Sequence, residues 1–296
     1  MQANHSLKPF VKWAGGKTQI LTSIRTKYPV ENVVTKYAEP FVGGGAVLFD
    51  ILNRYNFTDI YISDINRELI HTYVSIRDHI NELVDELSRL ENQYLPMSEE
   101  TRKTMYYTKR ERFNSLKLSN TMNTELAALF IFLNRTCFNG LYRVNTKGEF
   151  NVPQGSYKKP RICDEDNLRT ISSALQRVII ICGDYKLSRQ FIDSNTFAYF
   201  DPPYRPLSTT ANFTAYTQGD FRDEQQVELA KFIDEMSAQG AWIVASNSDP
   251  MNTDENDDFF DILYAKHVIT RIDATRTINS VASKRGCVRE LLIVNN

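Results

Sequence analysis

The chain has 296 residues, of which 42% are hydrophobic and 24% are charged, and its formal net charge is −1. This composition is typical of a soluble globular protein, and the neutral balance argues against a surface that binds nucleic acid everywhere. The sequence has no apolar run of membrane-spanning length, and residues 1–8 lack the apolar core of a secretory signal, so we expect a cytoplasmic protein.

Cysteines and histidines show no pattern that indicates a disulfide framework or a metal site. The four cysteines form no CxxC pair, and the four histidines are scattered without metal-ligand spacing. We therefore expect reduced thiols and no bound metal.

Two stretches are basic although the whole chain is not. Residues 135–161 hold six Lys or Arg residues against one Glu, and residues 266–289 hold six against one Asp. Concentrated charge of this kind favours a directed site for a polyanion, and the alternative is a pair of solvated loops.

The first motif is Gly15-Gly16-Lys17-Thr18. It lacks the earlier glycine that a P-loop requires, because Val11 occupies that position. We expect a glycine turn that opens a helix over about 18–27, with Lys17 near an anionic group and Trp13 against a flat ring. The alternative is an aromatic core anchor followed by a helix cap.

Residues 36–49 predict a strand, a turn with three successive glycines at 43–45, and a helix. Residues 59–64 predict a second strand that ends in Asp64, and Asn66 then starts a helix that runs to about Ile80. The spacing is not GxGxxG, so no nicotinamide fingerprint is supported. The pattern is typical of half of a nucleoside-binding α/β fold, in which the acid accepts hydrogen bonds from ribose hydroxyls.

Residues 81–133 predict helices that do not belong to the sheet, so we expect an insertion there. Residues 134–153 follow, and short alternating runs around 145–148 predict a hairpin that carries Tyr142, Arg143 and Asn151. A basic hairpin with an aromatic residue can enter a DNA groove, where Arg recognises guanine and Asn recognises adenine. The alternative is a surface hairpin with solvated charges.

The second half of the chain returns to alternating strands and helices. We expect strands at 178–181, which leads to Asp184, and at 196–200, which leads to Asp201, and also at 241–247, 260–268 and 288–294. A helix is expected over 223–240, a lid loop near the site over 206–220, and a basic loop over 271–287.

The segment Asp201-Pro202-Pro203-Tyr204 directly follows a predicted buried strand. The two prolines end ladder pairing, so an acid, two rigid carbonyls and an aromatic ring are held at the carboxyl end of the strand. Ligands of open α/β sheets bind at that end. Taken alone, the segment also fits a strand with a proline turn.

The order of these motifs resembles the alpha group of amino-directed DNA methyltransferases, which use S-adenosylmethionine. Residues 12–17, 39–45, 138–143 and 201–208 resemble the Dam-type (D12 class) adenine-N6 methyltransferases, which methylate GATC. The resemblance implies an α/β fold with a Rossmann-like mixed sheet, helices on both faces, and an inserted helical and β-hairpin target-recognition domain. The implied boundaries are 1–80 and 166–296 for the catalytic domain and 81–165 for the insertion.

The resemblance also implies roles for individual residues. The cofactor-binding candidates are Trp13, Lys17, Glu39, Pro40, Phe41, Gly43, Gly45, Asp64, Asp184 and Asp201. The DNA-binding candidates are Phe138, Asn139, Leu141, Arg143 and Pro153, to which the basic stretches add Arg135, Lys284 and Arg285. The catalytic candidates are Asp201, Pro202 and Tyr204.

These roles predict base flipping followed by direct transfer of a methyl group to the adenine amine in double-stranded DNA, without a metal. We also expect the protein to act as a monomer. The alternatives are methylation of RNA adenine or of cytosine N4, and a DNA-binding module without activity. Cytosine-N4 enzymes usually have serine in place of Asp201, which disfavours that alternative. The sequence leaves open a solitary methylase, a restriction partner or a phage protein.

Overall fold

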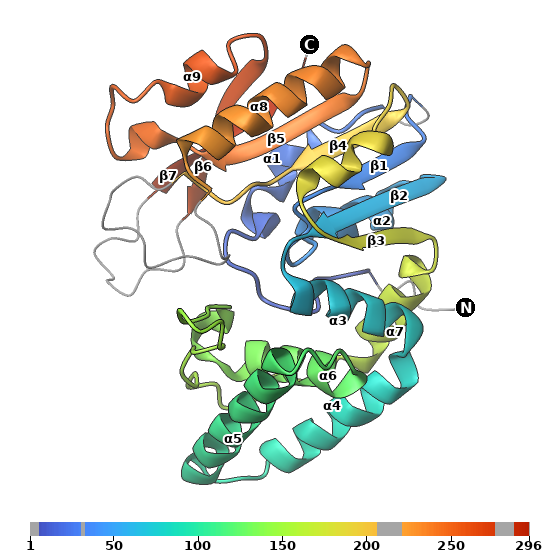
Figure 1. The fold of residues 1–296 in the computed structure, drawn as a ribbon, viewed down its shortest axis with the longest axis vertical. Helices are drawn as coiled ribbons and strands as arrows, with labels where there is room; N and C mark the ends of the chain where they lie inside the picture. The colour runs from blue at the N-terminus through green and yellow to red at the C-terminus, as the bar shows by residue number, and fades with distance from the viewer. Residues whose placement is uncertain (1–5, 31–32, 206–220, 276–286, 296) are drawn as a thin grey trace. The chain divides into compact units, whose positions relative to one another are not determined.

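The computed structural model describes residues 6–30, 33–205, 221–275 and 287–295 (Figure 1). Its seven-stranded sheet has the order β3-β2-β1-β4-β5-β7-β6. The strands are β1 (Lys36–Glu39), β2 (Asp59–Asp64), β3 (Val178–Cys182), β4 (Thr196–Phe200), β5 (Trp242–Ser248), β6 (Val268–Thr275) and β7 (Cys287–Val294). The neighbours β2, β1, β4 and β5 are parallel, whereas β7 is antiparallel to both β5 and β6. This mixed sheet confirms the expected α/β class.

Strand β4 is buried along its whole length, as expected for a central strand. Phe197 and Phe200 point to opposite faces, because side chains alternate along a strand. Phe200 packs against Phe232 of α8 (Asp223–Ala238), and Phe197 packs against Tyr28, which follows α1 (Leu21–Arg25). The two helices therefore cover opposite faces of the sheet, as Figure 1 also shows.

The chain forms two compact units. The unit that we call the helical unit contains residues 1–16, 43–54 and 64–182, and the unit that we call the strand unit contains residues 17–42, 55–63 and 183–296. The boundaries of the catalytic and target-recognition domains stay a prediction.

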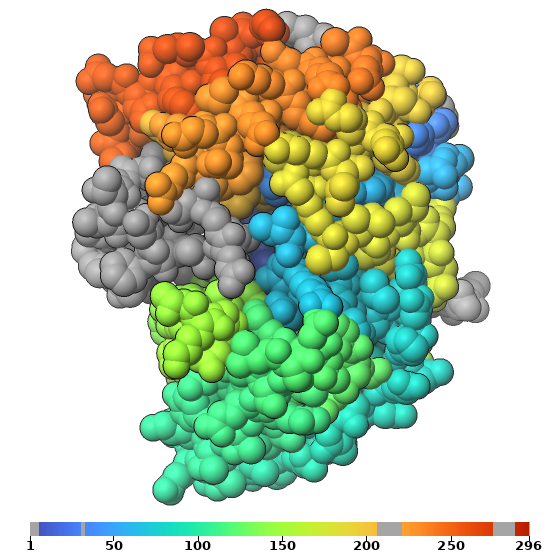
Figure 2. Space-filling model, viewed as in Figure 1, coloured from blue at the N-terminus to red at the C-terminus, as the bar shows by residue number. Residues whose placement is uncertain are grey.

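The helical unit is built around α6 (Thr124–Thr136), which is buried on nearly all sides. Its neighbours include α3 (Arg67–Asp78), α4 (Ile80–Tyr94) and α5 (Glu99–Leu118), and the unit also holds α2 (Ala46–Arg54), η2 (Phe138–Gly140) and α7 (Glu165–Leu175). The side chains of Asn66, Ser98 and Asn123 cap α3, α5 and α6. Figure 2 shows α4 and α5 at the surface of this unit.

The expected hairpin is present in a reduced form. Val144 and Phe150 form a single antiparallel bridge, and the turn between them is closed by the side chain of Asn145, which accepts the amide hydrogens of Lys147 and Glu149. Tyr142 is buried, so it is not available to DNA as the hairpin prediction supposed.

The segment 260–268 does not form the expected strand. Residues Phe259–Leu263 form helix α9, and β6 begins only at Val268. The buried residues Phe260 and Tyr264 are four apart, which is helical spacing, and periodicity alone does not separate a short apolar helix from a strand. The helix expected over 18–27 is shorter, with η1 at Lys17–Gln19 and α1 after it.

Two expectations, the lid loop at 206–220 and most of the basic loop, lie outside the described residues. In the described ranges, no helix has both the length and the apolar character needed to cross a membrane. The same residues contain no group of three or more His, Cys, Asp or Glu side chains that could hold a metal ion.

Candidate active site

Asp201 lies directly after β4 in the strand unit, where its neighbours orient its carboxylate. Lys17 Nζ lies 2.7 Å from Asp201 Oδ1, and Ser246 Oγ donates a 2.9 Å hydrogen bond to the same oxygen. None of the described residues donates a hydrogen bond to Asp201 Oδ2. The side chain is 21% exposed, so a substrate can reach it. The carboxylate is therefore held by one oxygen and can accept a hydrogen bond at the other.

Ser246 forms a relay with Tyr199. The hydroxyls of Tyr199 and Ser246 are 2.8 Å apart and both are buried. Because serine has one hydroxyl hydrogen and donates it to Asp201, Tyr199 donates to Ser246. Burial, followed by the charge of Asp201, raises the pKa of Tyr199 well above its usual value, so Tyr199 keeps its proton. The relay therefore orients Asp201 through two hydroxyl groups that are both uncharged.

Lys17 is buried and contacts three polar groups of the site. Its ammonium group donates to Tyr204 Oη at 2.8 Å and forms ion pairs with Asp201 and, at 3.7 Å, with Glu290 Oε2. Burial lowers the pKa of Lys17, but the charges of Asp201 and Glu290, together with the contact to Tyr204, outweigh that effect and raise it. Lys17 therefore carries a positive charge that balances two acidic side chains.

For the two carboxyl groups of the site, unlike for Lys17, the effect of burial on the pKa outweighs the effect of the neighbouring charge. Burial raises the pKa of Asp201 and of Glu290, and the charge of Lys17 opposes both shifts. Burial also raises the pKa of the Tyr204 hydroxyl, so Tyr204 remains a neutral phenol. The site thus combines a positioned carboxylate, a buried ammonium group and an aromatic ring.

Sequence reasoning missed Ser246 and Glu290. Each is a polar residue inside a strand that is otherwise mostly apolar, β5 and β7. That pattern could have identified them, because a polar side chain in a buried strand needs a partner. Glu290 pairs in register with Ser248, at the end of β5 that adjoins Asp201.

Three more cofactor candidates of the strand unit lie at the end of β1. The Glu39 carboxylate is 2% exposed and accepts a 2.6 Å hydrogen bond from the hydroxyl of Tyr37. The Pro40 carbonyl accepts from Ser63 at 3.4 Å, and the ring of Phe41 stacks on Tyr185 with 5.4 Å between centroids.

Asp184 is exposed, and its side chain caps η3 (Tyr185–Gln190) by accepting the amide hydrogen of Lys186 at 3.0 Å. The local geometry thus gives Asp184 a capping role. Cofactor binding by Asp184 stays a prediction.

The glycine turn belongs to the helical unit, and Asp64 holds it. The Asp64 carboxylate accepts the amide hydrogen of Gly43 at 3.0 Å and that of Asn66 at 2.8 Å, one on each oxygen. Burial raises the pKa of Asp64, and these backbone hydrogen bonds oppose the shift. A Cβ atom at Gly43 or at Gly44 would lie 2.8 Å from the Trp13 side chain. The glycines therefore allow Trp13 to pack directly on the turn.

Comparison with known proteins identifies the family. Residues 13–278 match the D12 class of N6 adenine-specific DNA methyltransferases. The chain belongs to this family. It is an adenine-specific DNA methyltransferase, so the expected enzyme class and the methylation of adenine in DNA are confirmed.

Several relatives match almost the whole chain. The Type II methyltransferase M.MjaIII of Methanocaldococcus jannaschii is 47% identical over 98% of this chain and 99% of its own length. The Type II methyltransferase M1.LlaDCHI of Lactococcus lactis subsp. cremoris is 35% identical over 98% and 96% of the two chains. The DNA adenine methylase of Escherichia coli K12 is 35% identical over 96% and 94%.

The DNA-binding candidates of this D12 methyltransferase lie mostly around η2, in the helical unit. Phe138 is 45% exposed, which is unusual for a phenylalanine, and its amide donates to the Pro153 carbonyl at 2.8 Å. Asn139 is exposed and has φ 55°, and Arg143 is exposed. The structure brings together Phe138, Asn139 and Pro153, and Leu141 follows on the same segment with a partly exposed side chain.

Three further DNA-binding candidates differ from this group. The Arg135 guanidinium donates to the backbone carbonyls of Phe10 and Pro9, and burial lowers its pKa. This geometry gives Arg135 a role within the helical unit. Lys284 and Arg285 lie outside the described residues.

The glycine turn permits a direct test of its packing. Gly45 has φ +74°, and a Cβ there would lie 2.5 Å from Tyr73 Oη and 2.9 Å from the Phe49 ring. We expect Gly45→Ala to lower the free energy of unfolding by roughly 2–4 kcal/mol, through backbone strain and overlap together. The measurement is urea unfolding followed by circular dichroism.

Gly15→Ala is the matched control, because Gly15 has φ +75° but no atom of the described residues lies within 4 Å of its Cβ position. Its free energy of unfolding is expected to fall by only about 1 kcal/mol, because alanine at this position causes backbone strain but no overlap. Equal losses in the two variants would show that the overlap at Gly45 is relieved without cost.

Proposed function

We propose that this methyltransferase moves the methyl group of S-adenosylmethionine to N6 of adenine in GATC sites of double-stranded DNA, by base flipping and direct transfer. We further propose that it acts as a monomer, in the cytoplasm. The observation that carries the proposal is the Asp201 carboxylate, which Lys17 and Ser246 hold by Oδ1 while Oδ2 accepts no bond from the described residues.

The residues at the strand ends fit the proposed cofactor chemically. S-adenosylmethionine supplies an electrophilic methyl group on a sulfonium, and it also carries an ammonium group and ribose hydroxyls that need acceptors. Asp64 and Glu39 each follow or end a parallel strand, and carboxylate oxygens have further lone pairs beyond the bonds that they already accept. We propose that Glu39 to Gly45, Asp64 and Trp13 hold the cofactor, with Lys17, Asp184 and Asp201 as further candidates.

The chemistry at adenine follows from Asp201 and its neighbours. The lone pair of the adenine amine is delocalised into the ring, so the amine is a poor nucleophile. When Asp201 Oδ2 and the Pro202 carbonyl accept its two hydrogens, the nitrogen moves toward tetrahedral geometry and its lone pair becomes available. The balance of charge among Lys17, Asp201 and Glu290 stabilises the partial positive charge that develops on the nitrogen.

We propose that Tyr204 holds the flipped base. Its hydroxyl is fixed by Lys17 at 2.8 Å, which orients the ring. Stacking of a base on such a ring is worth about 1–3 kcal/mol, comparable to the few kcal/mol that unstacking the adenine costs. We propose that Tyr204 offsets the cost of base flipping and that the segment 138–153 selects the GATC site.

Fluorescence of 2-aminopurine tests this proposal. The analogue replaces the adenine of a single GATC site in one duplex, and a matched duplex carries it in the permuted sequence GTAC. We expect a strong rise in fluorescence on binding to the GATC duplex and little change with the permuted one, since an extruded base is unstacked. Methylation of GATC without any rise would contradict base flipping, and equal rises in both duplexes would contradict the proposed specificity.

A further inference from the structure

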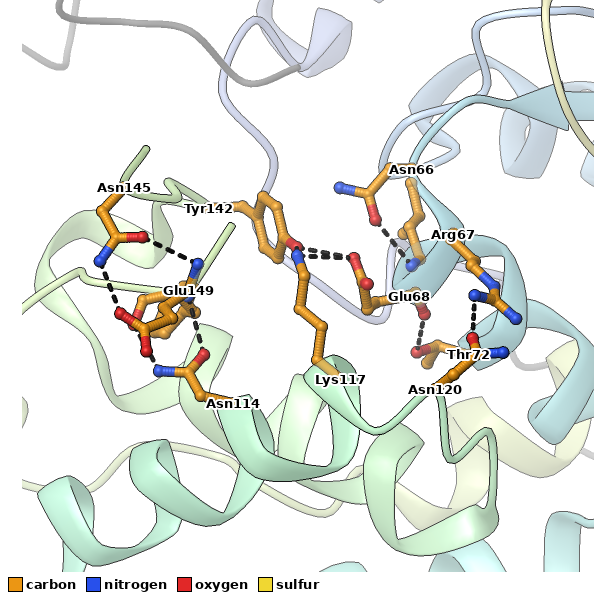
Figure 3. Close-up of polar contacts among 12 residues, drawn as sticks. Asn66, Arg67, Glu68, Thr72, Asn114, Lys117, Asn120, Tyr142, Asn145 and Glu149 are labelled. Atoms are coloured by element: carbon orange, nitrogen blue, oxygen red, sulfur yellow. Dashed lines mark hydrogen bonds and ion pairs between the residues drawn. The ribbon is translucent and has the colours of Figure 1, made fainter. Parts of the chain in front are cut away.

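Three polar side chains of the helical unit form a closed network that the proposed chemistry does not use (Figure 3). Glu68 Oε2 accepts a 2.7 Å hydrogen bond from the Tyr142 hydroxyl and a 3.2 Å bond from Lys117 Nζ. Lys117 Nζ also donates to the Tyr142 oxygen at 2.8 Å. Each member therefore contacts both of the others, and we call the three residues the Glu68 network.

Two members of the Glu68 network are buried and the third, Lys117, is only 17% exposed, so the geometry of the network is strongly specified. Glu68 is 8% exposed and Tyr142 is 5% exposed. Burial, and then the charge of Glu68, raises the pKa of Tyr142 well above its usual value, so the phenol remains protonated and donates to the carboxylate. Loss of a hydrogen-bond partner by a buried carboxylate lowers the stability of the folded protein. The three side chains are therefore expected to keep one arrangement.

Helix α3 connects the Glu68 network to the glycine turn. Glu68 lies in the first turn of α3, whose N-cap is Asn66. The Asn66 amide donates to Asp64, and the other oxygen of Asp64 accepts from Gly43. A displacement of the glycine turn therefore acts on the start of α3 and on Glu68.

A second connection between the Glu68 network and the glycine turn is the aromatic stack of Trp13 on Tyr142. The ring of Trp13 stacks on Tyr142 with 6.0 Å between centroids and an angle of 24°. Trp13 also packs against Gly43 and Gly44, where no side chain fits. The turn and Tyr142 are thus joined by two routes, one polar and one aromatic.

Tyr142 belongs to the segment that carries the DNA-binding candidates. Its neighbours Leu141 and Arg143 are both more exposed, so Tyr142 anchors a stretch whose adjacent side chains are directed away from the core. The following turn is fixed separately, because Asn114 of α5 bonds both the amide and the carbonyl of Phe150. Tyr142 therefore anchors the backbone that carries Leu141 and Arg143, and the Arg143 guanidinium is held in addition by a 2.8 Å hydrogen bond to Asn151 Oδ1.

We propose that the Glu68 network is a positioning device that couples occupation of the methyl-donor turn to DNA recognition by residues 138–153. This inference rests on the proposed function, because it assumes that the donor binds at the glycine turn. Donor binding that orders Asp64 and Trp13 strengthens the arrangement in which Tyr142 holds Leu141 and Arg143 for DNA. By thermodynamic linkage, DNA binding then strengthens donor binding by the same factor.

The test is the reciprocal coupling factor in Tyr142→Phe. This change removes the hydroxyl and keeps the ring that stacks on Trp13. Titration calorimetry gives the Kd of S-adenosylhomocysteine with and without a GATC duplex, and the Kd of the duplex with and without S-adenosylhomocysteine. We expect a factor of at least about 5 in both directions for the wild type and a factor below about 2 for the variant.

Glu125→Gln is the matched control. Glu125 of α6 forms a two-bond ion pair with Arg112 of α5 within the same unit, and neither residue belongs to the Glu68 network. A purely structural role of the Glu68 network would lower thermal stability and leave the coupling factor unchanged, as is expected for Glu125→Gln. If Tyr142→Phe does not fold, Lys117→Met, which removes the ammonium group, decides the question by the same titrations.

The outcomes separate this inference from the function on which it rests. A wild-type protein that methylates GATC but shows a coupling factor of 1, or variants that keep the wild-type factor, would overturn the inference alone. A wild-type protein that neither binds S-adenosylhomocysteine nor transfers a methyl group from S-adenosylmethionine would overturn the proposed function first.

Discussion

Asp201→Asn is expected to reduce the single-turnover rate of methyl transfer by about 10²–10³-fold, the range for loss of one preorganised hydrogen-bonding group in an active site. Asparagine keeps the shape of the side chain and an oxygen that can accept the bond from Ser246. It removes the charge that balances Lys17, however, and its amide group presents a donor or a weaker acceptor to the adenine amine. Rapid-quench measurement with a GATC duplex and labelled S-adenosylmethionine gives the rate.

The Kd for DNA is expected to stay within about threefold in the same variant, because phosphate and groove contacts dominate affinity. Asp193→Asn is the control, since Asp193 lies just before β4, at the end opposite to Asp201, where it pairs with Lys36. Near-normal transfer in Asp201→Asn would show that the carboxylate charge is not needed for catalysis.

Lys17→Met is expected to lower both stability and activity strongly. The change leaves two acidic side chains, Asp201 and Glu290, without the ammonium group that balances them. Breaking a buried ion pair costs roughly 3–5 kcal/mol, and we expect roughly 3 here, because Asp201 is 21% exposed. The measurement is the free energy of unfolding in urea at pH 7.

The loss in Lys17→Met should depend on pH with a definite sign. Burial already raises the pKa of Asp201 and Glu290, and Lys17 opposes both shifts, so both pKa values rise further in the variant. Protonation then removes the uncompensated charge. The difference in unfolding free energy between wild type and variant is expected to be largest at neutral pH and to shrink as the pH falls through these raised pKa values.

A double variant tests the same balance. Glu290→Gln in the Lys17→Met background removes one of the two uncompensated charges, so it is expected to recover part of the lost stability. Simple addition of the two single losses would contradict the proposed interaction between Lys17 and Glu290.

Much of this site could be predicted from the sequence because its residues stand at strand ends. Asp201 directly follows the buried strand β4, and Pro202 marks where the strand ends. Neighbouring parallel strands place their carboxyl ends at one edge of the sheet, so a local pattern predicts a location in three dimensions. The hairpin turn at Asn145 was predictable for the same reason, since its chemistry is local.

Long-range partners could not be predicted in this way. Ser246 contacts Asp201 across 45 positions of the chain, and Tyr142 contacts Glu68 across 74. Nothing in the local sequence around Tyr142 distinguishes a buried anchor from an exposed aromatic side chain in a basic hairpin. The strand expected over 260–268 was wrong because a short apolar run fits both a helix and a strand.

We propose that Asp201 and its neighbours methylate the adenine of GATC. The most direct test is to treat duplex DNA with the purified protein and methyl-labelled S-adenosylmethionine, and then to map the modified base at nucleotide resolution. The proposed function predicts N6-methyladenine at GATC on both strands, and no label when Asp201→Ala replaces the wild type. Label on cytosine, or on adenines outside GATC at comparable rates, would contradict it.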